Sequence, residues 1–268
     1  MVDVTCSEPS RPGARVHADI ALRAGGSAVG AALAAAESGA SATVLGRIGV
    51  DEAGDLVLAK LAAAGVAAAL VRDRDRPTGV AVAFPGSTVV AARGANAGFA
   101  AEDVPEVVEG DALLVSGFAL FQKGSSEAAA VAIERFAGGW IGIDVASPAL
   151  ASTARDADIP APSPARTAIL VTAEEARAMT GAGPAEAARA LGSRFDVACV
   201  KFGEDGALAV AGELEERRRV ERVERRSPFG AGDAFAGAFL VALSSGHSLG
   251  LALDLACATG ARAAGRSR

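Results

Sequence analysis

The second half of the sequence alternates short apolar runs with segments of helical periodicity, and this alternation limits the fold more than any other feature. The runs are rich in Val, Ile and Leu, as expected of strands that are buried on both faces. Their alternation with helices predicts an α/β fold, a doubly wound and mostly parallel sheet with helices on both faces. Ligands of such sheets bind at the carboxyl ends of the strands, where this chain has Asp144, Thr172 and Gly203. We expect strands over residues 112–117, 140–144, 168–171 and 196–203.

Composition excludes several classes of protein. The 268 residues suffice for one large domain with a sizeable core, and 51% of them are hydrophobic. The net charge of −6 argues against a general nucleic-acid binder. The apolar runs are too short to span a bilayer, and no signal-peptide pattern precedes them. The three cysteines are widely spaced, which fits a reducing compartment. We therefore expect a cytoplasmic protein that binds neither nucleic acid nor membranes.

A glycine-containing loop leads into an apolar helix near the end of the chain. Residues 227–232 contain one Pro and two Gly, and after Asp233 the apolar residues Phe235, Phe239 and Leu243 recur four apart. The first turn of a helix has unpaired N–H groups and a positive dipole end, so it can hold a phosphate. A carboxylate in that turn can deprotonate a hydroxyl while a phosphoryl group is held nearby. The same pattern also fits an ordinary cap, in which Asp233 only stabilises the helix.

The first hundred residues contain a second glycine-rich pattern. Gly25 and Gly26 precede an Ala-rich helix, and a strand and the run Gly-Arg-Ile-Gly-Val-Asp-Glu-Ala-Gly at 46–54 follow. Further along, residues 78–84 and 88–92 flank a Pro-Gly turn and predict a hairpin. Residues 15–22 alternate polar and apolar side chains, which predicts a half-buried strand. An ordinary α/β unit would explain the helix and the strands, but not this combination of glycines.

Together these motifs resemble the ribokinase-like (PfkB) family of carbohydrate kinases, and the resemblance spans nearly the whole chain. The run Gly-Ala-Gly-Asp-Ala-Phe at 230–235 is similar to the family's second signature, and residues 25–54 are similar to the first. The resemblance implies the ribokinase-like fold, in which a small β-sheet lid closes over a sugar. It also implies ATP-dependent phosphorylation of a hydroxyl of a small sugar or sugar acid, such as ribose or 2-keto-3-deoxygluconate. The implied cofactors are ATP and Mg²⁺, with K⁺ as a further candidate.

The resemblance also implies a role for individual residues. In the catalytic centre, Asp233 would be the base, beside an anion hole formed by the backbone of Gly230, Ala231 and Gly232. The residues implied in sugar binding are Asp3, Gly25, Gly26, Gly30, Arg93 and Asn96. Those implied in nucleotide binding are Lys201, Gly203, Gly206, Thr172 and Cys257. Mg²⁺ would be positioned by Glu175.

The chain departs from the family pattern at several of these positions. The family usually has Asn where this chain has Gly30 and Thr172, and often has Asp where it has Ser227. Cys257 falls near a position that is often Asn beside the adenine. Family members also open with a core strand before the residue that Asp3 matches, and we expect that strand to be missing here.

The expected organisation is a lid built from residues 1–23 and 70–95, on a kinase core built from residues 24–69 and 96–268. Family members often dimerise through the exposed lid sheet, so a homodimer is a candidate assembly. Two other functions remain open. One is a nucleoside kinase of the same fold, although Phe84 is the only aromatic residue of the expected lid. The other is a non-catalytic member that binds a sugar or a nucleotide without phosphoryl transfer.

Overall fold

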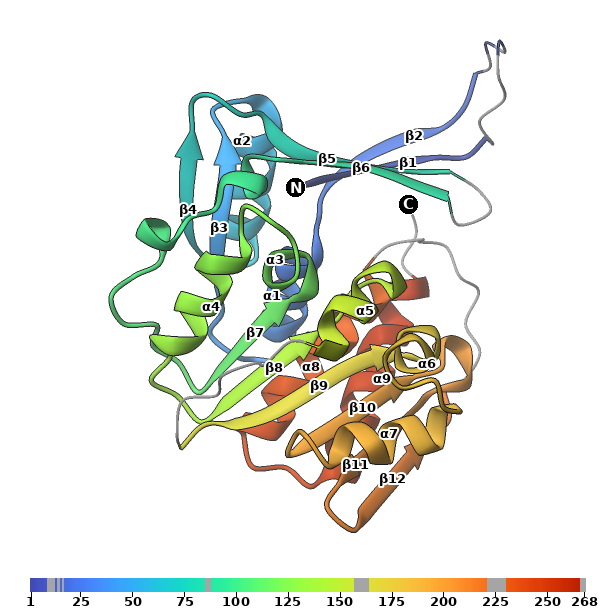
Figure 1. The fold of residues 1–268 in the computed structure, drawn as a ribbon. Helices are drawn as coiled ribbons and strands as arrows, with labels where there is room; N and C mark the ends of the chain where they lie inside the picture. The colour runs from blue at the N-terminus through green and yellow to red at the C-terminus, as the bar shows by residue number, and fades with distance from the viewer. Residues whose placement is uncertain are drawn as a thin grey trace.

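The computed structural model describes residues 1–8, 13, 15, 17–84, 88–156, 164–220 and 230–265. Its largest element is a six-stranded sheet in the order β12-β11-β10-β9-β8-β7 (Figure 1). Strands β7 to β10 pair in parallel, whereas β11 and β12 are antiparallel to their neighbours, so the expected mostly parallel sheet is confirmed. The strands are β7 (Ala112–Ser116), β8 (Trp140–Asp144), β9 (Arg166–Thr172), β10 (Val197–Lys201), β11 (Ala207–Ala211) and β12 (Leu214–Arg218).

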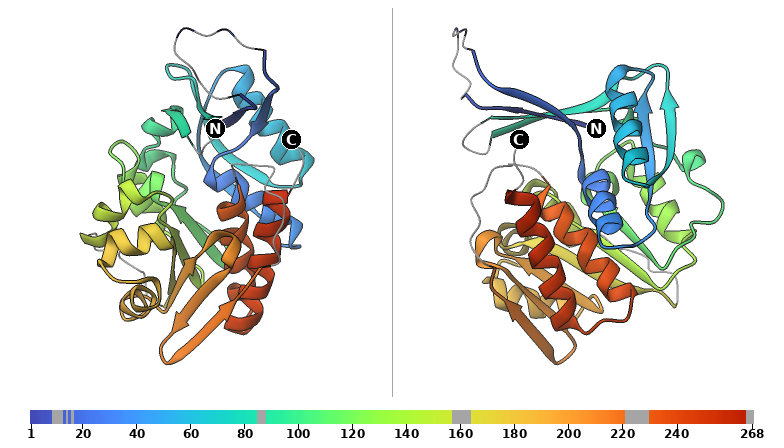
Figure 2. Two further views of the ribbon diagram at one scale, coloured as in Figure 1. Left: turned by 90° about the vertical axis from the view of Figure 1, so that its right-hand side faces the viewer. Right: turned by 180° about the vertical axis from the view of Figure 1, so that it is seen from behind.

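Helices cover both faces of this sheet (Figure 2). Alternate side chains of β9 enter two different cores, because successive residues of a strand point to opposite faces. Ile169 and Val171 pack in one cluster, whereas Ala168 and Leu170 pack in the other. On the first face lie α3 (Gly117–Leu120), α4 (Ser126–Glu134), α5 (Pro148–Asp156), α6 (Ala173–Thr180) and α7 (Pro184–Gly192). On the second face lie α8 (Ala231–Ser244) and α9 (Leu249–Gly265).

A separate four-stranded sheet, in the order β2-β1-β5-β6, extends above the carboxyl ends of the large sheet (Figure 1). The expected hairpin is confirmed, because β5 and β6 pair as antiparallel neighbours. The strand expected over residues 15–22 begins later, at Ile20, and pairs with β1. The strands are β1 (Val2–Cys6), β2 (Ile20–Ala24), β5 (Thr78–Phe84) and β6 (Thr88–Gly94). We call this four-stranded sheet the lid sheet.

A third unit joins the two sheets. Strands β3 (Thr43–Gly49) and β4 (Ala67–Asp73) form a two-stranded parallel sheet of their own, so residues 70–73 do not pair with the lid sheet. The helices of this region are α1 (Ser27–Glu37) and α2 (Glu52–Ala63). Short 3₁₀ turns follow later in the chain, at Ala95–Gly98, Ala101–Asp103 and Gly203–Asp205. Within the described residues, no helix is long and apolar enough to cross a membrane.

Candidate active site

The glycine loop and the helix that the sequence predicts meet at the start of α8. Gly230 caps this helix with a φ of +88°, in the left-handed region that favours glycine. The first intrahelical hydrogen bond runs from the Ala234 N–H to the Gly230 carbonyl. The N–H groups of Ala231, Gly232 and Asp233 therefore have no acceptor within the helix. Such free N–H groups at a helix start can bind anions.

Asp233 lies in this first turn, and its carboxylate accepts a hydrogen bond from the Ser27 side chain. Ser27 is the first residue of α1, so two helices hold the carboxylate between them. Burial, together with the negative charge of Asp144, raises the pKa of Asp233 to about 6. Lys201 acts in the opposite direction and lowers it. A carboxylate with such a pKa is ionised at neutral pH and still takes up a proton readily, as a general base must.

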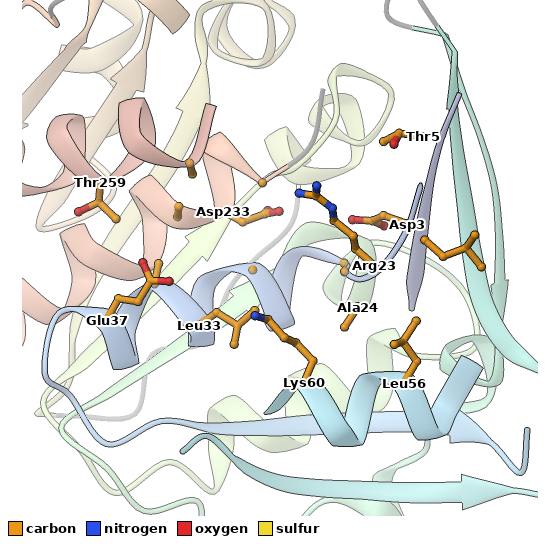
Figure 3. Close-up of a pocket in the computed structure, with 18 residues that line it drawn as sticks. Asp3, Thr5, Arg23, Ala24, Leu33, Glu37, Leu56, Lys60, Asp233 and Thr259 are labelled. Atoms are coloured by element: carbon orange, nitrogen blue, oxygen red, sulfur yellow. The ribbon is translucent and has the colours of Figure 1, made fainter. Parts of the chain in front are cut away.

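The start of α1 also holds a second carboxylate. Asp3 of β1 accepts a hydrogen bond from the backbone N–H of Gly26, and burial raises the pKa of Asp3 above its ordinary value. A Cβ atom at Gly25 would collide with the Asp3 carboxylate, so a larger residue there would have to displace this carboxylate. Arg23 stands directly opposite Asp3 in the register of β1 and β2. Figure 3 shows the side chains of Asp3, Arg23 and Asp233 pointing toward one another.

These groups line a pocket of about 480 Å³ between the lid sheet and α8 (Figure 3). The predicted residues that the pocket brings together are Asp3, Gly25, Gly26, Gly30, Gly230 and Asp233. Its remaining lining residues are Thr5, Leu22, Arg23, Ala24, Leu33, Ala34, Glu37, Leu56, Lys60, Ala234, Thr259 and Ala263. The pocket thus joins the base to four of the six predicted sugar-binding residues.

Gly30 has a steric role in this structure. It lies where α1 crosses α8, and a Cβ atom at this position would come 2.9 Å from the Asp233 Cβ. Gly237 marks the same close crossing, because a Cβ there would collide with the Ala31 carbonyl. The glycine that departs from the family pattern therefore lets α1 approach the base closely.

Two predicted sugar-binding residues lie outside this pocket. The Asn96 side chain accepts a hydrogen bond from the backbone N–H of Arg47, at 3.2 Å, and thereby ties a 3₁₀ turn to β3. The Arg93 guanidinium donates to the Lys123 carbonyl and to the Ser125 hydroxyl. In this arrangement both side chains hold neighbouring loops together.

The predicted nucleotide-binding residues surround the carboxyl ends of β9 and β10. Gly203 faces open space, whereas a Cβ atom at Gly206 would collide with the Arg218 carbonyl. Cys257 is buried between α9 and the sheet, and burial raises the pKa of its thiol to about 11. Lys201 is also buried, and its ammonium contacts Asp144 at 2.8 Å.

Thr172 and Glu175 form a capping box at the start of α6. The Thr172 hydroxyl accepts from the Glu175 N–H, and the Glu175 carboxylate accepts from the Thr172 N–H at 2.8 Å. Burial raises the pKa of Glu175. The capping bond occupies one carboxylate oxygen, and no group of three metal-ligating side chains occurs among the residues that the structure describes. Mg²⁺ that binds through one or two carboxylates and the phosphates of a nucleotide fits this donor set.

Sequence reasoning missed three features of the site. Ser27 follows the Gly-Gly pair directly, so its place beside the base was open to inference from that motif. No sequence pattern indicated that Arg23 lies in the site, because its place opposite Asp3 depends on the register of the lid sheet. The Asp144–Lys201 pair joins residues 57 positions apart. Ser227, a predicted departure, lies outside the described residues.

Comparison with known proteins agrees with the fold over the whole chain. The pattern of the pfkB family carbohydrate kinases matches residues 1–268. A putative Ribokinase II from E. coli, in complex with ATP and Mg²⁺, is 21% identical with a TM-score of 0.82, over 99% of this chain and 90% of that one. Aminoimidazole riboside kinase from Salmonella enterica is 25% identical with a TM-score of 0.77, over 100% and 91% of the two chains.

A fructokinase from Vibrio cholerae is 23% identical, with a TM-score of 0.78, over 99% of this chain and 91% of that one. A search of curated proteins found no match. The ribokinase-like fold that the sequence motifs imply is therefore confirmed. The chain belongs to the PfkB family of carbohydrate kinases, ATP-binding phosphotransferases with an alcohol group as acceptor.

Proposed function

We propose that this protein phosphorylates a hydroxyl of a small sugar or sugar acid at the pocket below the lid sheet, with ATP as donor. One observation carries the proposal. Asp233, with a pKa of about 6, lies in the first turn of α8 and in the same pocket as Asp3. A base and a row of anion-binding amides at one helix start are what transfer of a phosphoryl group to a hydroxyl requires.

In the proposed mechanism, Asp233 accepts the proton of the attacking hydroxyl, and Ser27 holds the carboxylate in position through its hydrogen bond. The amides of Ala231 and Gly232 stabilise the negative charge of the phosphoryl group. The Gly203 turn would hold the nucleotide, since a Cβ atom added at Gly203 would meet no atom within 4 Å. Glu175 is the residue that would position Mg²⁺, which would supply neutralisation of the phosphate charge when it is bound with the nucleotide.

The pocket favours a sugar or a sugar acid over a nucleoside. None of the described residues that line it is aromatic, so the pocket offers no ring on which a base could stack. Asp3 suits sugar hydroxyls, because a carboxylate accepts hydrogen bonds. Arg23 adds a cation on the opposite strand, which suits the carboxylate of a sugar acid. Arg23→Leu should therefore lower the affinity for sugar acids more than for neutral sugars.

One face of the lid sheet carries apolar side chains in a row. Leu22, Val4, Val82 and Val90 stand in this row across the four strands. Val4 packs against a buried cluster with residues of α1 and α2, so the exposed apolar side chains lie at the two edges of the sheet. Leu22 is 62% exposed and Val90 61%, which is unusual for large apolar side chains in a row. We propose that a second copy of the chain covers this face in a homodimer, and that residues 1–23 and 70–95 act as the lid. We further propose a cytoplasmic location, which the three free cysteines fit.

The test is an ATPase-coupled assay against a panel of pentoses, hexoses, 2-keto-3-deoxygluconate and nucleosides, with and without Mg²⁺ and K⁺. We expect Mg²⁺-dependent turnover on a sugar or a sugar acid. Asp233→Asn should reduce kcat by at least about a thousandfold while ATP still binds. Asp111→Asn, which removes an exposed carboxylate outside the pocket, is the matched control. Nucleoside turnover alone would favour the nucleoside kinase, and nucleotide binding without any turnover would favour a non-catalytic member.

A further inference from the structure

Lys201 is the only cation among the buried residues that the structure describes, and two of the three buried carboxylates, Asp144 and Glu175, act on its charge. It ends β10, and its Nζ lies 2.8 Å from the Asp144 Oδ1 at the end of β8. The other two lysines of the chain, Lys60 and Lys123, are exposed. Burial of an ammonium ion is costly, so its position needs an explanation.

The ammonium lies close to the first turn of α8. A Cβ atom built on Gly232 would lie 3.8 Å from the Lys201 Nζ, and outside the neighbouring residues and backbone of its own helix no other atom comes within 4 Å of that point. Because Gly232 has no side chain, none fills the space beside the ammonium. The cation and the free amides of this turn can therefore bind the same anion.

The local charges favour a permanently protonated lysine. Burial disfavours the ammonium, but the charge and the hydrogen bond of Asp144, together with the neighbouring groups, more than offset this effect and raise the pKa of Lys201. Glu175 acts in the same direction. An ammonium has three N–H donors, and within the described part of the chain its hydrogen bond goes to Asp144 alone. The remaining donors are available to an anion.

We propose that Lys201 binds the phosphoryl group that is transferred, close to the first turn of α8, with Asp144 as the positioning residue that fixes the ammonium. This inference rests on the proposed function. During transfer the sugar oxygen forms a bond to the γ-phosphorus, the bond from that phosphorus to the β,γ-bridging oxygen breaks, and ADP leaves. Asp233 takes the hydroxyl proton. Lys201 stays protonated throughout and compensates the charge of the moving group.

Nucleotide binding tests the inference without turnover. Dissociation constants for ADP and for a non-hydrolysable ATP analogue, both with Mg²⁺, are measured by calorimetry on the wild type and three variants. Lys201→Met removes the cation, and Lys123→Met is the matched control on an exposed lysine. Lys201→Met leaves the Asp144 carboxylate buried without its partner, which could destabilise the fold. The double variant Lys201→Met/Asp144→Asn removes both charges and so avoids this loss of stability.

We expect both Lys201→Met variants to bind the ATP analogue at least about tenfold more weakly while ADP binding changes less than about threefold. Wild-type affinity for both nucleotides in the double variant would show that Lys201 only neutralises Asp144, and would overturn the inference. Equal losses for ADP and the analogue would also overturn it, because Lys201 would then contact the shared phosphates. A wild type that binds neither nucleotide would overturn the proposed function and this inference together.

Discussion

Replacing Asp233 with Asn should abolish activity and at the same time make the folded protein more stable above pH 6. The pKa of this carboxyl rises from the ordinary value of 3.8 to about 6 on folding, chiefly because of burial. The folded state therefore binds the proton more tightly than the unfolded state, and the ionised form costs stability as pH rises through this interval. At about 1.4 kcal/mol per pKa unit, the cost above pH 6 is about 3 kcal/mol.

Asn removes this cost and keeps an oxygen that can accept from Ser27. We expect the Tm of Asp233→Asn to exceed that of the wild type by roughly 6 to 12 °C at pH 8, and the difference to vanish by about pH 4. Differential scanning calorimetry between pH 4 and pH 8, without ligands, measures it, and Asp111→Asn should show no comparable trend. A variant that is no more stable than the wild type at pH 8 would refute the reasoning, since the site would then impose no penalty on the charge.

Three further substitutions test the surroundings of the base. Gly25→Ala should displace the Asp3 carboxylate and raise KM for the sugar by at least about tenfold, with nucleotide affinity unchanged in calorimetry; an unaltered KM would show that Asp3 does not hold the sugar. Gly30→Ala forces α1 away from α8 and should lower kcat by about 10 to 100-fold in the coupled assay, and a normal kcat would mean that the crossing tolerates a methyl group. Asp51→Ala removes the cap of α2 and the partner of the buried Thr78 hydroxyl, so urea unfolding should show a loss of about 2 to 3 kcal/mol, and a loss below about 0.5 kcal/mol would contradict the assigned bonds.

Local patterns were enough to predict the four parallel strands of the large sheet. The run from Trp140 to Asp144 is apolar up to its last residue, and the structure places a strand there with the same bounds. The start of α8 was equally open to prediction, because glycine and the helical spacing of Phe235 and Phe239 are local signals. Such features depend on residues that are close in sequence.

Features that depend on register or on distant contacts were not predictable in the same way. The strand expected over residues 15–22 begins at Ile20. Its bounds are set by its pairing with β1 and not by the alternation of polar and apolar side chains. Arg23 enters the pocket through that same register. Asn96 is of a residue type that can bind sugar hydroxyls, but in the structure its amide oxygen accepts a hydrogen bond from the backbone N–H of Arg47 on a distant strand. No local pattern distinguishes these outcomes.

Asp51 connects the third unit to the lid sheet. Its carboxylate accepts hydrogen bonds from the Gly54 N–H, from the Thr78 N–H and from the Thr78 hydroxyl, at 2.6 to 2.8 Å. Burial works against the charge, but these bonds hold the pKa of Asp51 below its ordinary value. The start of α2 and the start of β5 are thereby locked to one another.

These bonds should make α2 move together with the lid sheet. Helix α2 carries Leu56 and Lys60, which line the pocket. A movement that starts at β5 would be transmitted through Asp51 to α2, so the wall of the pocket that α2 forms would move with the lid sheet. Hydrogen exchange with and without a sugar reports on this directly, since amides of α2 should then gain protection together with those of β5.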